Sequence, residues 1–107
     1  MLLVLPASAV LNAADWPRFR GPQGDGTSSD KGVPTEWSAS KNLKWKLQLP
    51  GKGFSSPIVV GKSVFVTAYS GSGSKVDRHI VCVDRETGDI TWSKSVEGVS
   101  DGGGPGF

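Results

Sequence analysis

Hydrophobic and polar positions alternate most regularly in the middle of this chain. Every second position is apolar in the run Leu43-Lys44-Trp45-Lys46-Leu47-Gln48-Leu49, and the positions between are polar. Successive side chains of a β-strand point to opposite faces of its sheet, so the pattern predicts a strand over residues 43–49 with one buried and one solvent-exposed face.

Apolar runs rich in β-branched residues follow, separated by turn signals. Residues 58–60 and 63–69 flank Gly61-Lys62, and glycine in the first position of a two-residue loop favours a type II′ hairpin turn. Residues 79–84 and 90–96 predict a third and a fourth strand, the fourth with alternating faces. Residues 70–78 are polar and rich in Gly and Ser, which predicts a flexible loop. The chain is therefore expected to be all-β.

The turn between the third and fourth predicted strands contains residues suited to a tight reversal. Asp84 can accept hydrogen bonds from the backbone N–H groups that follow it, as in an Asx turn, and Thr87 can add a hydroxyl bond. Gly88 can adopt the positive φ that such a turn needs. Trp92 then offers a large apolar surface with one N–H donor, suited to packing one sheet on another.

These residues resemble a known repeat. Their spacing is similar to the tryptophan-docking repeat of pyrroloquinoline-quinone-type (PQQ-like) β-propellers, A-x-D-x-x-T-G-x-x-x-W. The matching residues are Asp84, Thr87, Gly88 and Trp92, and Cys82 stands where the repeat has alanine. The separation of Trp45 and Trp92 also fits the period of roughly 40–50 residues that propeller blades show.

A second resemblance lies near the start of the chain. Residues 15–22 read Asp-Trp-Pro-Arg-Phe-Arg-Gly-Pro, which is similar to the start of many exported propellers of the same family. The Gly and Pro residues that follow exclude a regular helix or central strand. We therefore expect an irregular arm over residues 15–42, anchored by Trp16, Phe19 and Trp37.

The first 14 residues have the character of a secretory signal peptide. An uncharged apolar run is followed by small residues ending in Asn12-Ala13-Ala14, which predicts cleavage after Ala14 or one residue earlier. A basic start is missing, so the initiator is expected further upstream. Export to the periplasm or the extracellular space is the expected localisation.

Together the resemblances imply an antiparallel four-stranded blade of a PQQ-like β-propeller, preceded by one outer strand and belonging to an incomplete ring. The predicted order is a signal peptide at 1–14, the arm at 15–42, an outer strand at 43–49 that would close the last blade, the first blade at 54–97 and a Gly-rich linker at 98–107. A single blade leaves apolar faces uncovered, since repeat units need neighbours to bury them. We therefore expect the isolated chain not to form a stable monomer.

The composition of the chain excludes several classes of function and of site. The 107 residues suffice for one small domain, and a net charge of +2 with scattered lysines argues against a nucleic-acid surface. No stretch reaches the roughly 20 apolar residues of a membrane-spanning helix. Cys82 is the only cysteine and His79 the only histidine, which excludes an internal disulfide and a Cys-based metal site. We interpret Cys82 as a small core residue and His79 as a surface or packing residue.

Two loops could suggest ligand sites, but neither has the required pattern. Asp25 and Asp30 have carboxylates suited to calcium, yet their spacing does not fit an EF-hand and the closing Glu is missing. Gly51-Lys52-Gly53 lacks the phosphate-loop pattern and is interpreted as a β-turn linker. No catalytic, cofactor-binding or metal-binding residue is therefore predicted in this segment.

The resemblance implies two classes of function. The first is a non-catalytic exported propeller that acts as a scaffold or protein-binding platform, whose partners would be the missing blades and other proteins. The alternative is a quinoprotein dehydrogenase, in which PQQ and calcium at the ring centre would oxidise alcohols or sugars. A third reading is an independent secreted module that associates blade to blade into a ring.

Overall fold

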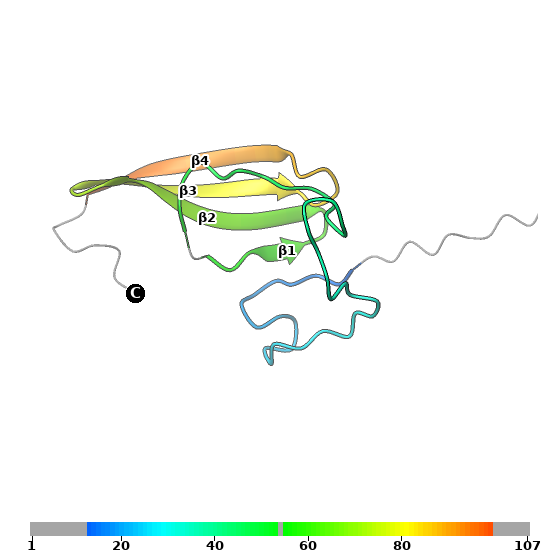
Figure 1. Ribbon diagram of the computed structural model, residues 1–107. Coiled ribbons are helices and arrows are strands. Elements are labelled where there is room, and N and C mark those ends of the chain that lie inside the picture. Colours follow the sequence, from blue (N-terminus) through cyan, green and yellow to red (C-terminus); the bar gives the residue numbers. More distant parts are fainter. Residues whose placement is uncertain (1–12, 54, 100–107) are drawn as a thin grey trace, which may run out of the picture.

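The computed structural model describes residues 13–53 and 55–99, and the regular secondary structure of these residues is one open antiparallel sheet without helices (Figure 1). Its four strands lie in the order β1-β2-β3-β4. They are β1 (Ile58–Val60), β2 (Ser63–Ser72), β3 (Lys75–Asp84) and β4 (Ile90–Val99). The predicted all-β class with a four-stranded antiparallel sheet is confirmed. Most of the predicted signal peptide at 1–14 lies outside the described residues, as does Phe54.

The β1–β2 connection is the predicted hairpin. Val60 pairs with Ser63, so Gly61 and Lys62 form a two-residue loop. Gly61 has φ +56°, and Asn42 is the only non-glycine residue in the described ranges with a positive φ, so Lys62 keeps a negative φ. A positive φ at the first loop position alone is the signature of a type II′ turn.

The predicted flexible loop at 70–78 is wrong, because these residues continue β2 and β3. Their pairing runs without interruption to Ser72 and Lys75, and only Gly73 and Ser74 form the turn. Ladder hydrogen bonds use backbone groups, so polar and glycine residues can extend a hairpin once the neighbouring apolar residues fix its register. Gly71 permits this close pairing, since a Cβ atom there would overlap the carbonyl oxygen of Lys75.

The β3–β4 pair departs from the predicted pattern in two ways. Cys82 pairs with Trp92 and Val83 with Ile90, which leaves Thr91 as an extra residue in a bulge and interrupts the predicted alternation of residues 90–96. In addition, β4 continues to Val99, so the predicted linker at 98–107 begins too early. The remaining residues of that linker lie outside the described ranges.

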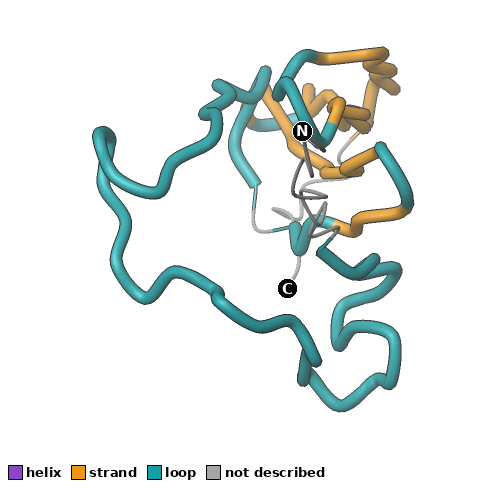
Figure 2. Tube along the Cα trace, turned by 90° about the vertical axis from the view of Figure 1, so that its right-hand side faces the viewer, coloured by secondary structure: helices purple, strands orange, loops and turns teal. Residues whose placement is uncertain are grey.

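Residues 43–49 do not form the predicted strand. They have no ladder partner among the described residues. Their burial alternates as expected from Trp45 on, with Trp45, Leu47 and Leu49 half-buried, but Leu43 is 45% exposed. The pattern of side chains predicted which side would be buried, but a strand also needs a neighbouring backbone. From the β3–β4 turn the segment runs along one side of the sheet and returns to β1 (Figures 1 and 2).

The two faces of the sheet differ in exposure. We define the covered face by Val64, Val66, Val81 and Val83, and the open face by Phe65, Ile80, Trp92 and Val96, following the pairing register. On the covered face Val81 and Val83, in the central strand, are 0% and 2% exposed, whereas Ile90 in the edge strand is 44% exposed. On the open face Ile80, Trp92 and Val96 are 40%, 41% and 68% exposed.

The arm is anchored by one of its three predicted aromatic residues. Trp16 pairs with Val59 through two backbone hydrogen bonds of 2.8 Å, which extends the sheet by one bridge beyond β1. Phe19 and Trp37 are 72% and 74% exposed, so their predicted anchoring role is wrong. The Gly- and Pro-rich sequence folds the arm into turns that do not bring these two rings to the sheet.

Candidate docking interface

The β3–β4 turn is built as the sequence predicts. The Asp84 carboxylate accepts the backbone N–H groups of Glu86 at 2.8 Å and Thr87 at 2.9 Å, and the Thr87 hydroxyl accepts the N–H of Asp89 at 3.2 Å. Gly88 has φ +77° and donates its N–H to the Asp84 carbonyl. The Thr87 and Glu86 N–H groups lower the pKa of Asp84 from its ordinary value of 3.8. These bonds make the turn a rigid element.

Trp45 docks onto this turn. Its indole N–H donates to the carbonyl oxygen of Arg85 at 2.9 Å, and its ring lies against Gly88, which is buried. A Cβ atom on Gly88 would lie 2.6 Å from the ring, so only glycine leaves room for it. Lys44 adds an exposed ion pair with Glu86. The spacing between Trp45 and Trp92 suggested that the two tryptophans are equivalent, so that Trp45 is a second tryptophan of the docking type, but it did not indicate which surface receives the ring.

Arg85 connects this turn to the start of the arm. Its guanidinium donates to the carbonyl oxygens of Ala13 at 2.6 Å and Gly61 at 3.2 Å, and lies 3.6 Å from the Asp15 carboxylate. Asp15 in turn accepts the N–H of Gly61 at 2.9 Å. Most of the partners of Arg85 are backbone carbonyls of loops distant in the sequence, for which the sequence contains no signal.

Cys82 lies at the centre of the open face, between the two aromatic residues. It pairs with Phe65 on one side and Trp92 on the other, and those rings approach each other at a centroid distance of 6.1 Å and an interplanar angle of 53°. Cys82 is therefore 3% exposed, which confirms its prediction as a small core residue. Trp92 remains 41% exposed and is not brought to Trp45, which packs at the turn.

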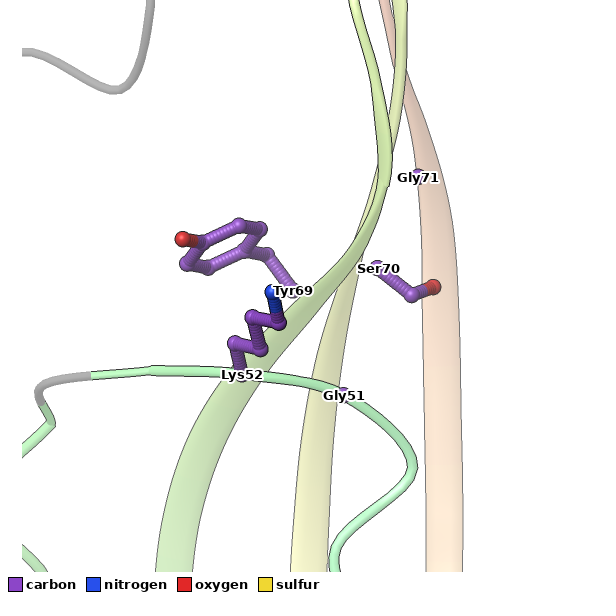
Figure 3. A pocket seen from close by; sticks show the side chains of 5 residues that line it. All are labelled: Gly51, Lys52, Tyr69, Ser70 and Gly71. Atoms are coloured by element: carbon purple, nitrogen blue, oxygen red, sulfur yellow. The ribbon is translucent and has the colours of Figure 1, made fainter.

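A shallow hollow of about 340 Å³ lies where the chain before β1 pairs with β2 through the Lys52–Tyr69 bridge. It is lined by Gly51, Lys52, Tyr69, Ser70 and Gly71. The side chains of Lys52 and Tyr69 extend to the same side, whereas that of Ser70 points away (Figure 3). The Ser70 hydroxyl instead shares a 2.7 Å hydrogen bond with His79 Nε2. His79 is half-buried, in keeping with its prediction as a surface or packing residue.

Within residues 13–53 and 55–99 there is no group of three or more His, Cys, Asp or Glu side chains that could hold a metal ion. None of these residues belongs to a helix long and apolar enough to cross a membrane. Comparison with known proteins identifies no relative, since no family model, curated protein or solved structure matches the chain significantly. The geometry of the docked indole is therefore the main observation that bears on function.

Proposed function

We propose that this chain is the N-terminal part of an exported PQQ-like β-propeller that acts as a non-catalytic scaffold or protein-binding platform. The observation that carries the proposal is the docking of Trp45 on the β3–β4 turn. An indole from outside the sheet fits the Gly88 surface and hydrogen-bonds the Arg85 carbonyl, which is how one element of a repeat architecture can hold the next.

The open face supports the same proposal. Ile80, Trp92 and Val96 lie on one face of the sheet and are 40%, 41% and 68% exposed. Exposed apolar surfaces of this kind mark sites where another protein surface packs. In a propeller, the face would be covered by the next blade, and Trp92 would dock on that blade as Trp45 docks here.

The proposal includes export of the protein that contains the ring. The predicted signal peptide supports export, and the arm that follows it is tied to the sheet by Trp16 and Asp15. A quinoprotein dehydrogenase is the alternative, and it would need PQQ- and calcium-binding residues from several blades. No residue of this segment is assigned to either group.

The reading frame beyond residue 107 provides the first test. We expect further Asp-x-x-Thr-Gly-x-x-x-Trp repeats at intervals of roughly 40–50 residues. A frame without such repeats would contradict the propeller. The full-length product should then be purified, supplied with PQQ and calcium, and assayed for dye-linked oxidation of alcohols and sugars. The scaffold predicts no dye reduction, whereas reduction that requires PQQ would establish the dehydrogenase.

A further inference from the structure

We propose that the open face, at the end where β2 turns into β3, is a binding site for an acidic segment of a partner protein. The site is the cationic row, which we define as Lys52, Tyr69 and Arg78. The inference rests on the proposed role of the chain as a protein-binding platform and deepens it by specifying the chemistry of the partner.

The cationic row places a positive charge on either side of one phenol ring. Lys52 and Tyr69 exchange backbone hydrogen bonds of 2.8 and 2.7 Å, and Tyr69 pairs with Arg78 in the β2–β3 ladder. Directly opposed residues of antiparallel strands share one face, so all three side chains belong to the open face. Since neighbouring strands lie roughly 4.8 Å apart, the two cations flank the ring across roughly 10 Å of the sheet.

Glycine residues fix two members of the row. A Cβ atom on Gly51 would overlap the carbonyl oxygen of Tyr69, so glycine allows the close approach that places Lys52 beside β2. Gly98 is buried, and an added Cβ there would lie 3.0 Å from a guanidinium nitrogen of Arg78. The guanidinium therefore rests against β4, which reduces the side-chain entropy lost when it binds a partner.

The positive charges at this end of the open face lack carboxylate partners. The ion pairs within residues 13–53 and 55–99 join other side chains, namely Lys41 with Glu36, Lys44 with Glu86 and Arg85 with Asp15. Lys94 adds a third cation, because it pairs with Ile80 on the same face. Asp77 and Glu97 are directly opposite each other in the register and belong to the other face. An acidic partner would therefore complement the open face, and a basic one would be repelled.

The residue types favour a protein as the partner. Tyrosine and arginine are enriched where the energy of protein interfaces is concentrated, and arginine binds a carboxylate through two parallel hydrogen bonds. Val96 pairs with Arg78 and is 68% exposed, so an apolar side chain of the partner has a surface beside the carboxylate site. Lys52, Arg78 and Lys94 are fewer than the roughly four to eight cations typical of anionic-lipid sites.

The cationic row is separate from the surface proposed for the next blade. Arg78 precedes Cys82, the ladder partner of Trp92, by four residues of β3. At a rise of roughly 3.3 Å per residue, this separation is about 13 Å. Binding of an acidic segment at the row and docking of Trp92 on a blade therefore use different parts of the open face.

A labelled acidic peptide tests the site. The probe is fluorescein-labelled Glu-Glu-Leu-Glu-Glu, and its control has Gln in place of every Glu. With the full-length product, fluorescence anisotropy should show saturable binding of the Glu peptide and at least about tenfold weaker binding of the Gln peptide. Arg78→Gln and Lys52→Gln should each raise the Kd of the Glu peptide at least about threefold. Arg78→Lys keeps the charge and should raise it less than Arg78→Gln does.

Lys75→Gln is the matched control, because Lys75 is an exposed cation of β3 that belongs to the other face. It should leave the Kd unchanged. The side chains of Lys52, Lys75 and Arg78 are all exposed, so each variant should keep the fold. Equal binding of the two peptides, or an equal loss in Lys75→Gln and Arg78→Gln, would overturn the proposal.

A lipid arm and the reading frame separate the remaining outcomes. Sedimentation of the protein with vesicles of equal parts phosphatidylserine and phosphatidylcholine, if it depends on Arg78, would overturn the proposal, because the face would then recognise lipid. The proposed function fails separately, through a reading frame without repeats. A full-length propeller that does not bind the Glu peptide would contradict the acidic-segment site alone.

Discussion

The indole ring of Trp45 lies so close to Gly88 that a single Cβ atom on the glycine would come within 2.6 Å of it. Gly88 also has φ +77°, a conformation that residues with a side chain rarely adopt. One residue thus shapes both the turn and the surface that receives the tryptophan. The repeat-like spacing of Asp84, Thr87 and Gly88 acquires a physical meaning from this contact.

Gly88→Ala should destabilise the fold by about 2–4 kcal/mol, since it combines backbone strain with loss of the docked ring. Gly73→Ala is the matched control, because Gly73 has φ +64° but no atom within 4 Å of an added Cβ. The control should lose only about 1 kcal/mol, the backbone strain alone. Urea denaturation followed by tryptophan fluorescence measures both values. Equal losses would show that the contact with Trp45 contributes nothing.

Trp45→Phe should lower the free energy of unfolding by about 1 kcal/mol, because the ring still fills the surface but the hydrogen bond to the Arg85 carbonyl is lost. Trp37→Phe is a suitable control, since Trp37 is 74% exposed. The control should be neutral within about 0.5 kcal/mol. Denaturation curves at one protein concentration provide the comparison, and a neutral Trp45→Phe would contradict the role of the N–H donor.

Cys82→Ala should retain the sheet and cost about 1 kcal/mol, since it removes one small buried group from beneath Phe65 and Trp92. Cys82→Leu should cost more, about 1–3 kcal/mol, because the added volume forces these rings apart. In the folded wild-type chain, a thiol reagent should label Cys82 much more slowly than in urea. Rapid labelling under native conditions would show that the aromatic pair does not cover the thiol.

Stability should fall in acid partly through Asp84. The N–H groups of Thr87 and Glu86 lower the pKa of its carboxyl group, so the folded state favours the carboxylate. This contribution is complete above the ordinary value of 3.8 and is lost as the pH falls through the lower folded-state pKa. Asp84→Asn keeps an oxygen acceptor but does not titrate, so its Tm should fall less than that of the wild type between about pH 6 and about pH 3.

Asp25 is a second source of acid sensitivity, because the N–H and hydroxyl of Thr27 lower the pKa of its carboxyl group. It lies in the arm, remote from the β3–β4 turn in sequence, and is unchanged in Asp84→Asn. Any acid sensitivity that survives in this variant is therefore expected to shrink further in Asp84→Asn/Asp25→Asn. Identical pH profiles for the wild type and Asp84→Asn would exclude the turn as a source of acid sensitivity.

The sequence by itself determined the local structure of the sheet. Gly61-Lys62 specified the first hairpin, and Asp84, Thr87 and Gly88 specified the β3–β4 turn, because their conformations depend on backbone and side-chain chemistry within a few residues. The burial of Cys82 also followed from its place in an apolar run. In these cases neighbours in the sequence are also neighbours in space.

Only the tertiary structure decided what the distant segments contact. The extension of β2 and β3 through residues 70–78, the lack of a ladder partner for residues 43–49 and the bulge at Thr91 depend on which backbone lies alongside. The acceptor of Trp45 and the backbone partners of Arg85 were equally unpredictable. Carbonyl groups are the same in every residue, so a sequence records a donor such as an indole but not the carbonyl that it will reach.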